Sequence, residues 1–228
     1  AKTENIAVEE VVQTTSQSKP IPQVTPISNQ TGNTFEYDGR SIETAFPLTV
    51  GQTEALKELV EFSNSKEKVI TLQGAAGTGK TAVIGYLQKY LSGKNFLYMA
   101  PTHAATAELA FATVKTGNRE LPMTVQSSFR RSKNRFTGKE EAVMSKKAED
   151  KLMFGDNNII VIDEVSMLTK KDYDVINEAI KDKNVKIIFM GDIKQIPEVD
   201  VRNPQVKQVS KAFSEPKQLR LTEVKRTE

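Results

Sequence analysis

One eight-residue run, GAAGTGKT, constrains the fold of this chain more than any other feature. It matches the pattern G-x-x-x-x-G-K-[ST] in full, and it comprises Gly74, Ala75, Ala76, Gly77, Thr78, Gly79, Lys80 and Thr81. In such a run the glycines let backbone N–H groups curl around phosphates, and the helix that follows offers its positive N-terminal end. We therefore expect a buried strand, a phosphate-binding loop and a helix in that order.

The chemistry of this loop assigns roles to two side chains. Lys80 is expected to reach the β- and γ-phosphates of a nucleotide, and the Thr81 hydroxyl to ligate Mg²⁺. The expected cofactors are therefore ATP and Mg²⁺. The alternative, a glycine-rich turn without a ligand, is disfavoured because an apolar run precedes the loop and a helical pattern follows it.

Short apolar runs alternate with helical patterns from about residue 48 onward. Continuous apolar strands between helices indicate a parallel sheet covered on both faces, so the predicted fold class is a doubly wound α/β domain. Helices are expected over 53–63, 81–91, 103–114 and around 173–180. Strands are expected over 68–72, 96–99, 159–162, 186–190 and 219–221.

Residues 1–46 differ from the rest of the chain. Their proline-, serine- and glutamine-rich composition gives little apolar surface to bury, so we expect a flexible or weakly docked polar extension followed by one domain over 47–228. A plain linker is the favoured interpretation of this extension, and a tether to a partner is the alternative.

Composition narrows the classes of function. The chain has no cysteine and one histidine, His103, which excludes disulfides, thiolate metal sites and a histidine-based metal centre. No apolar run approaches the roughly 18 residues that a membrane span needs, and the start lacks a signal-peptide core. We expect an intracellular, cytoplasmic protein, in the host cytoplasm if the chain is viral. A net charge of +3 permits a nucleic-acid partner without requiring one.

Polar residues follow two further predicted strands. Asp163 and Glu164 end the strand 159–162, at the sheet edge where open α/β folds bind ligands. An acidic pair there suits a Mg²⁺ partner, Asp163, and a base that polarises the attacking water, Glu164. After the strand 186–190, Gln195 lies within reach of the γ-phosphate or that water.

Five motifs in this order resemble the superfamily 1B DNA helicases of the Dda and RecD-like type. Besides the phosphate loop they are APTHAA at 100–105, DEVSM at 163–167, GDIKQI at 191–196 and LTEVKR at 221–226. The resemblance covers roughly residues 48–227 and implies a RecA-like P-loop NTPase domain. It also implies an ATP hydrolase that drives translocation along single-stranded DNA, in the 5′ to 3′ direction.

The resemblance assigns further residues to the nucleotide. Gln52 corresponds to a glutamine that reads adenine, and Gln195 to a sensor of the γ-phosphate. Arg226 corresponds to an arginine that contacts the γ-phosphate, where its fork of donors suits a phosphoryl group.

Contacts with single-stranded DNA are implied for Pro101, Thr102 and His103, although a solvated or capping role for His103 is an alternative. The segment 124–127 resembles a second DNA-contacting motif of the family, which implies contacts by Thr124 and Ser127, although Gln126 departs from the usual histidine.

The family inserts a small strand-separating hairpin where this chain has a basic segment. Residues 130–139 carry five arginines or lysines, a turn signal at Thr137-Gly138 and one aromatic, Phe136. We expect a pin insertion at about 130–156 with Phe136 near its tip, where an aromatic ring can wedge against a base. A solvated basic loop is an equal alternative.

The predicted function is therefore the motor domain of an ATP-dependent DNA helicase. Because such motors close two RecA-like domains around ATP, a second domain or a partner protein is expected to complete the site. Alone, this chain is predicted to bind ATP, hydrolyse it poorly and not unwind processively. The alternatives are an ATP-gated binding module, a superfamily 1 RNA helicase and, less favoured, a phosphotransferase.

Overall fold

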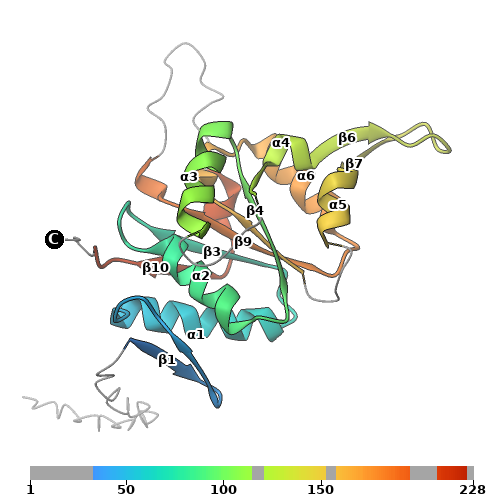
Figure 1. The fold of residues 1–228 in the computed structure, drawn as a ribbon. Helices are drawn as coiled ribbons and strands as arrows, with labels where there is room; N and C mark the ends of the chain where they lie inside the picture. The colour runs from blue at the N-terminus through green and yellow to red at the C-terminus, as the bar shows by residue number, and fades with distance from the viewer. Residues whose placement is uncertain (1–32, 115–120, 153–157, 196–209, 225–228) are drawn as a thin grey trace, which may run out of the picture. The chain divides into compact units, whose positions relative to one another are not determined.

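The computed structural model describes residues 33–114, 121–152, 158–195 and 210–224 (Figure 1). The elements, in chain order, are β1 (Thr34–Tyr37), β2 (Arg40–Glu43), α1 (Val50–Asn64), β3 (Val69–Gly74), α2 (Lys80–Tyr90), β4 (Asn95–Ala100), α3 (His103–Val114), β5 (Met123–Thr124), α4 (Val125–Ser128), β6 (Phe129–Lys133), β7 (Glu140–Met144), α5 (Lys146–Leu152), β8 (Asn158–Ile162), η1 (Val165–Met167), α6 (Lys170–Ile180), β9 (Val185–Gly191), η2 (Ile193–Gln195), η4 (Lys211–Ser214) and β10 (Gln218–Leu221). In this part of the chain no helix has the length and apolar character needed to cross a membrane.

The main sheet orders its strands β10-β3-β9-β8-β4-β5, and every neighbouring pair runs parallel. This confirms the predicted doubly wound α/β fold of the RecA-like P-loop type. Strand β9 lies between β3, which leads into the phosphate loop, and β8, which leads into the Asp163–Glu164 pair. The loop and the acidic pair therefore stand two strands apart at one edge.

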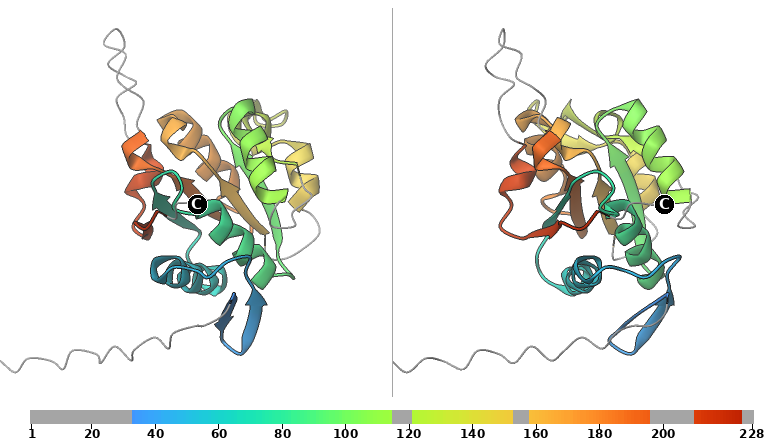
Figure 2. Two further views of the ribbon diagram at one scale, coloured as in Figure 1. Left: turned by 60° about the vertical axis from the view of Figure 1, so that its left-hand side comes forward. Right: turned by 90° about the vertical axis from the view of Figure 1, so that its left-hand side faces the viewer.

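Successive side chains of the buried strands point to opposite faces of the sheet, and each face has its own hydrophobic core. In β8, Ile159 and Val161 join a cluster with residues of α1, α2 and α3, whereas Ile160 and Ile162 join one with residues of α5 and α6. Side chains of a strand point to opposite faces in turn, so a strand covered on both faces must be apolar throughout. Figure 2 shows the helices on the two sides of the sheet.

The helices begin at sequence signals that fix their positions. Thr49 caps α1 and forms a capping box with Gln52, and Thr169 does the same for α6 with Asp172. Helix α6 therefore starts at Lys170, earlier than the apolar spacing around Tyr173 suggested.

The expectation of a flexible extension through residue 46 is wrong for residues 34–43, which form the antiparallel hairpin β1–β2. Phe35 is fully buried against Tyr90 of α2, with ring centroids 5.6 Å apart, and the Tyr90 hydroxyl donates to the Tyr37 carbonyl at 2.6 Å. Asp38 and Gly39 both have positive φ at the turn, as an Asp-Gly hairpin turn requires. Residues 1–32 lie outside the described residues.

Candidate functional site

The parallel sheet brings the predicted clusters to one edge. All six parallel strands end there, and polar segments lie at the ends of β3, β4, β8, β9 and β10, over 74–81, 101–103, 163–164, 192–195 and 222–224. The carboxyl edge of an open parallel sheet is where such folds bind ligands.

The phosphate loop runs from the end of β3 to the start of α2. Gly77 and Gly79 have φ of +77° and +82°, a conformation that glycine adopts without steric cost. The Lys80 ammonium donates to the carbonyls of Gly74 at 2.6 Å and Ala75 at 3.2 Å, so it lies over the loop. The Thr78 hydroxyl also donates to the Ala75 carbonyl, at 2.9 Å, which tightens the same turn. These contacts place an ammonium group beside a ring of backbone amides, an arrangement suited to a polyphosphate.

The acidic pair at the end of β8 is held in a defined geometry. Asp163 Oδ1 accepts from the Glu164 backbone N–H at 2.8 Å, and Glu164 adopts a left-handed conformation with φ 51° and ψ 42°. Positive φ is uncommon for a residue other than glycine and clusters at functional sites. Burial raises the pKa of Asp163 to about 6, an effect that the Glu164 N–H and the Lys80 charge oppose.

The raised pKa of Asp163 makes stability depend on pH. The folded carboxyl holds its proton more tightly than the unfolded one, so its burial costs nothing below about pH 4 and progressively more as the pH rises to 6. We expect Asp163→Asn, which retains the Oδ1 acceptor, to raise the free energy of unfolding by roughly 2–3 kcal/mol at pH 7.5 and by only about a third of that at pH 4.5. Urea unfolding without nucleotide or Mg²⁺ measures this. The control Asp150→Asn, exposed on α5, should have no such effect, and an equal gain at both pH values for Asp163→Asn would contradict the assignment.

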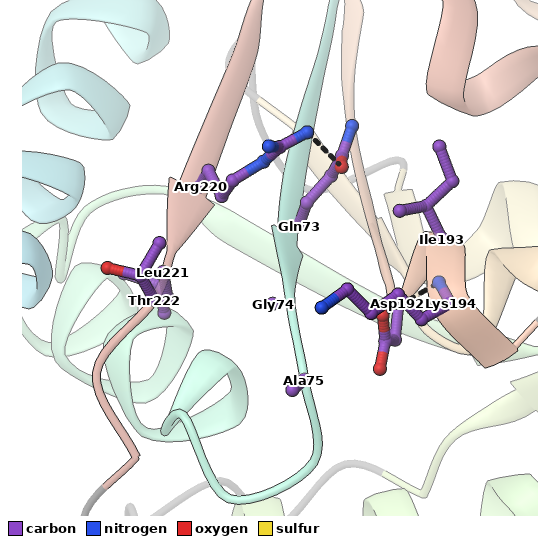
Figure 3. A pocket seen from close by; sticks show the side chains of 9 residues that line it. All are labelled: Gln73, Gly74, Ala75, Asp192, Ile193, Lys194, Arg220, Leu221 and Thr222. Carbon is purple, nitrogen blue, oxygen red and sulfur yellow. Dashed lines mark hydrogen bonds between the residues drawn. The ribbon is translucent and has the colours of Figure 1, made fainter.

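A pocket of about 260 Å³ lies beside the phosphate loop (Figure 3). Arg220 pairs in register with Gln73, and its guanidinium donates to the Gln73 side-chain carbonyl at 3.5 Å. The Lys194 side chain extends across the pocket toward β3, while its backbone N–H donates to Asp192 Oδ1 at 2.9 Å. The pocket thus holds two cations next to the loop.

Sequence reasoning missed Arg220, Gln73 and the Lys194 side chain. A signal was present for Arg220, because it stands between Leu219 and Leu221 on the last strand. The period of two places it on the face opposite those leucines.

Four further residues were predicted to contact the nucleotide, and they differ in exposure and in whether the structure describes them. Gln195 is exposed in η2, and its backbone N–H donates to the Asp192 carbonyl at 3.0 Å. Thr81 stands in the first turn of α2. Arg226 lies outside the described residues. Gln52 is only 2% exposed, and its side-chain amide bonds to the phosphate loop instead of facing open space.

The two predicted DNA-contacting segments lie next to each other, because Ala100 of β4 pairs in register with Thr124 of β5. Pro101 and Thr102 follow β4, and the Thr102 hydroxyl accepts from the Ala105 N–H at 3.1 Å at the start of α3. His103 is exposed, and so is Ser127. The Thr124 hydroxyl is buried and accepts from the Ser127 N–H at 3.2 Å, so it caps α4.

A hairpin formed by β6 and β7 occupies residues 129–144 and extends away from the sheet (Figure 1), so it takes up only the first part of the predicted insertion of 130–156; residues 146–152 form α5 instead. Phe129 and Met144 anchor its base in the core. The carboxylate of Glu178 on α6 joins both strands, since it accepts from the Arg131 guanidinium at 2.9 Å and from the Ala142 N–H at 3.3 Å.

The tip of this hairpin presents a bare aromatic ring. Asn134 Oδ1 accepts from the N–H groups of Phe136, at 2.9 Å, and Thr137, and Gly138 adopts φ +71°, so the turn is ordered by local contacts. Phe136 is 100% exposed. Exposed cations lie on β6 and in the turn, whereas β7 begins with the exposed Glu140 and Glu141; the cations are Arg130, Arg131, Lys133, Arg135 and Lys139.

Comparison with known proteins gives one family and several relatives. A family model described as "AAA domain" matches residues 47–228. The ATP-dependent DNA helicase dda of Enterobacteria phage T4 is 30% identical over 185 residues, which cover 79% of this chain and 40% of that protein. A protein of Acanthamoeba polyphaga mimivirus is 32% identical over 156 residues, 62% of this chain and 32% of that protein. The chain thus spans well under half the length of these relatives.

Two solved structures share the fold. A Bacteroides Pif1 bound to single-stranded DNA has a TM-score of 0.54 and 22% identity, covering 80% of this chain and 44% of that one. A Bacteroides Pif1 in complex with ADP-AlF4 has a TM-score of 0.53 and 21% identity, with the same coverage.

Proposed function

The chain belongs to the AAA domain family, and from that premise we propose that it is the ATP-hydrolysing motor domain of a DNA helicase. One observation carries the proposal: the phosphate loop, the Asp163–Glu164 pair and the Asp192–Gln195 segment follow parallel strands at a single sheet edge. The relative from phage T4 is itself an ATP-dependent DNA helicase, which supports this choice among ATP-using functions.

The side chains at this edge have separate roles in hydrolysis. Lys80 neutralises the β- and γ-phosphates, and Glu164 accepts a proton from the attacking water. Thr81 and Asp163 would hold Mg²⁺, which would supply positive charge to offset the charge that develops on the phosphates. Among the described residues no three His, Cys, Asp or Glu side chains gather into a metal site. That fits Mg²⁺, which proteins hold with one or two carboxylates together with substrate phosphates.

The segment that follows β9 couples the hydrolysis of the bound nucleotide to the binding of DNA. Gln195 stands exposed at the same edge, where it senses the γ-phosphate, and Arg226 supplies a further contact to that group. Single-stranded DNA lies across the neighbouring segments that carry Pro101, His103 and Ser127. A second RecA-like domain, or a partner protein, closes the site from the open side.

The β6–β7 hairpin acts as the wedge that separates strands. Its exposed cations neutralise DNA phosphates, and the bare Phe136 ring stacks against the base pair at the fork. The fixation of both strands to Glu178 gives the wedge a rigid base, as strand separation under load requires.

Hydrolysis coupled to unwinding tests the motor and the wedge together. We expect single-stranded DNA to stimulate ATP hydrolysis, and RNA to do so less. Phe136→Ala should leave that stimulation unchanged but lower the base pairs opened per ATP severalfold, because stacking of one aromatic on a base is worth about 1–3 kcal/mol. Forked-duplex unwinding with simultaneous phosphate release, by the chain together with the second RecA-like domain or partner protein that completes the site, gives both numbers.

Phe111→Ala is the matched control for the wedge, since Phe111 is 78% exposed on α3, away from the hairpin, and should change neither number. Unchanged unwinding per ATP in Phe136→Ala would exclude the wedge. Hydrolysis indifferent to any nucleic acid would contradict the motor.

A further inference from the structure

A larger pocket lies at the opposite edge of the main sheet from the phosphate loop. Its volume is about 520 Å³, and it is located where α1 ends and where β3 and β9 begin. The seven residues of β9 span roughly 20 Å, at about 3.3 Å per residue, so the length of the strand separates this pocket from the nucleotide edge.

Positive charge is concentrated at this pocket. Four lysines and one glutamate line it, which gives a net charge of +3, the same as that of the whole chain. The glutamate, Glu67, lies 3.4 Å from the ammonium group of Lys217. We call this cavity the basic pocket, and its lysines are Lys66, Lys68, Lys94 and Lys186.

Backbone carbonyls hold two of these ammonium groups in place. Lys94 donates to the Ser63 carbonyl at 2.8 Å, and Lys186 donates to the Ser65 carbonyl at 2.8 Å, so both surround the end of α1. In the part of the chain that the structure describes, neither forms an ion pair with a carboxylate. The carbonyls therefore position the two cations without neutralising them.

The two cations also destabilise each other's charge. Burial lowers the pKa of Lys94. Burial and then the repulsion from Lys94 lower the pKa of Lys186, and Glu67 opposes this only in part. An anion bound between the two ammonium groups would relieve that repulsion, because opposite charge favours the charged form of both lysines.

The chemistry of the lining favours carboxylates over nucleic acid. None of the described lining residues is an arginine, so the pocket lacks the fork of donors that binds phosphate by two parallel bonds. The Lys186 ammonium covers the ring of Phe62 at 4.7 Å from its centroid, and Phe62 is fully buried, so this ring cannot stack on a base. The lysines also surround one cavity, whereas a DNA backbone follows a stripe of charge.

We propose that the basic pocket binds an acidic peptide segment of a partner protein, with a carboxylate between the ammonium groups of Lys94 and Lys186. Exposed amide side chains beside them, Asn64 and Asn184, provide hydrogen bonds for the backbone of that peptide. Because the pocket lies at the far edge of the sheet, the partner can stay bound while the other edge binds nucleotide. This inference goes beyond the proposed motor function and does not depend on it.

Calorimetric titration of the full chain with an acetylated peptide of six aspartates tests the pocket. The wild type should bind one peptide saturably at low salt. The double variant Lys94→Gln, Lys186→Gln keeps an N–H donor at each position but loses both charges, so we expect affinity to fall about tenfold. The matched control is Arg135→Gln with Lys139→Gln, which removes two exposed cations from the β6–β7 turn and should leave the affinity unchanged.

A further variant removes charge without touching the end of α1. Lys66 is exposed and forms no hydrogen bond or ion pair with another described residue, so Lys66→Glu should keep the wild-type melting temperature. It should nevertheless weaken the peptide severalfold, because it places a negative charge at the pocket. Both pocket variants should bind MgATP as the wild type does, which separates this site from the nucleotide site.

Three results would overturn the proposal. The first is equal peptide affinity in the wild type and in both pocket variants. The second is equal binding of a peptide of six asparagines, which would show that charge is not recognised. The third is a loss of affinity for a six-nucleotide oligothymidylate in the pocket variants with peptide binding unchanged, which would assign the pocket to nucleic acid.

Discussion

Replacement of Lys80 by alanine should weaken MgATP binding by roughly 100-fold, because charge-assisted hydrogen bonds contribute about 1.5–3 kcal/mol each and the ammonium reaches two phosphates. The Lys80 ammonium already lies over the loop, bonded to the carbonyls of Gly74 and Ala75. Isothermal titration calorimetry of both proteins at one Mg²⁺ concentration measures the difference.

Lys89 offers the matched control for this variant. It stands in the last turn of the same helix, and its ammonium donates to the Glu43 carbonyl at 2.8 Å, away from the loop. Lys89→Ala should therefore bind MgATP as the wild type does. Equal affinities for Lys80→Ala and the wild type would show that the loop does not hold phosphate in the way described.

Replacement of Glu164 by glutamine should preserve MgATP binding and slow hydrolysis by a factor on the order of 10²–10⁴, the usual contribution of a general base. Glutamine has the same shape and the same backbone demand at φ 51°, but its amide does not accept a proton at neutral pH. Phosphate release under saturating MgATP, measured with the second RecA-like domain or partner protein that completes the site, together with affinity measured by calorimetry, distinguishes lost chemistry from lost binding.

The variant Glu108→Gln is the control that removes a negative charge near Asp163 without removing the proposed base. Its carboxylate is close enough to raise the pKa of Asp163 electrostatically, yet it lies on α3 and not at a strand end. Glu108→Gln should leave hydrolysis within a few-fold of the wild type. A comparable loss of rate in both variants would mean that negative charge near Asp163, and not a base at position 164, supports the reaction.

The resemblance to the superfamily 1B helicases is confirmed by the family match and the phage relative, and much of the fold followed from apolar runs. Runs such as 159–162 are apolar at every position, which only a strand buried on both faces tolerates. Their strand-end polar residues then had to share an edge, because parallel strands end together. Local sequence was sufficient for these inferences.

Other features were not predicted, because they depend on contacts between residues far apart in the sequence or because their local signal was weak. The β1–β2 hairpin has an Asp-Gly turn between alternating residues, but the polar surroundings of Phe35 concealed this fully buried anchor. The Arg220–Gln73 contact joins residues 147 positions apart, so it depends on the register of β10 on β3. The Gln52 amide meets Thr78 only because α1 and α2 pack together, which no local pattern encodes.

The central claim is that backbone amides and one ammonium group at the edge of this sheet bind the phosphates of a nucleotide beside a carboxylate pair. Calorimetric titration of the wild-type protein with ATP, with and without Mg²⁺, tests it most directly. The structure predicts saturable binding of one nucleotide per chain that weakens when Mg²⁺ is removed by a chelator. An absence of saturable heat with adenine nucleotides in the presence of Mg²⁺ would contradict it.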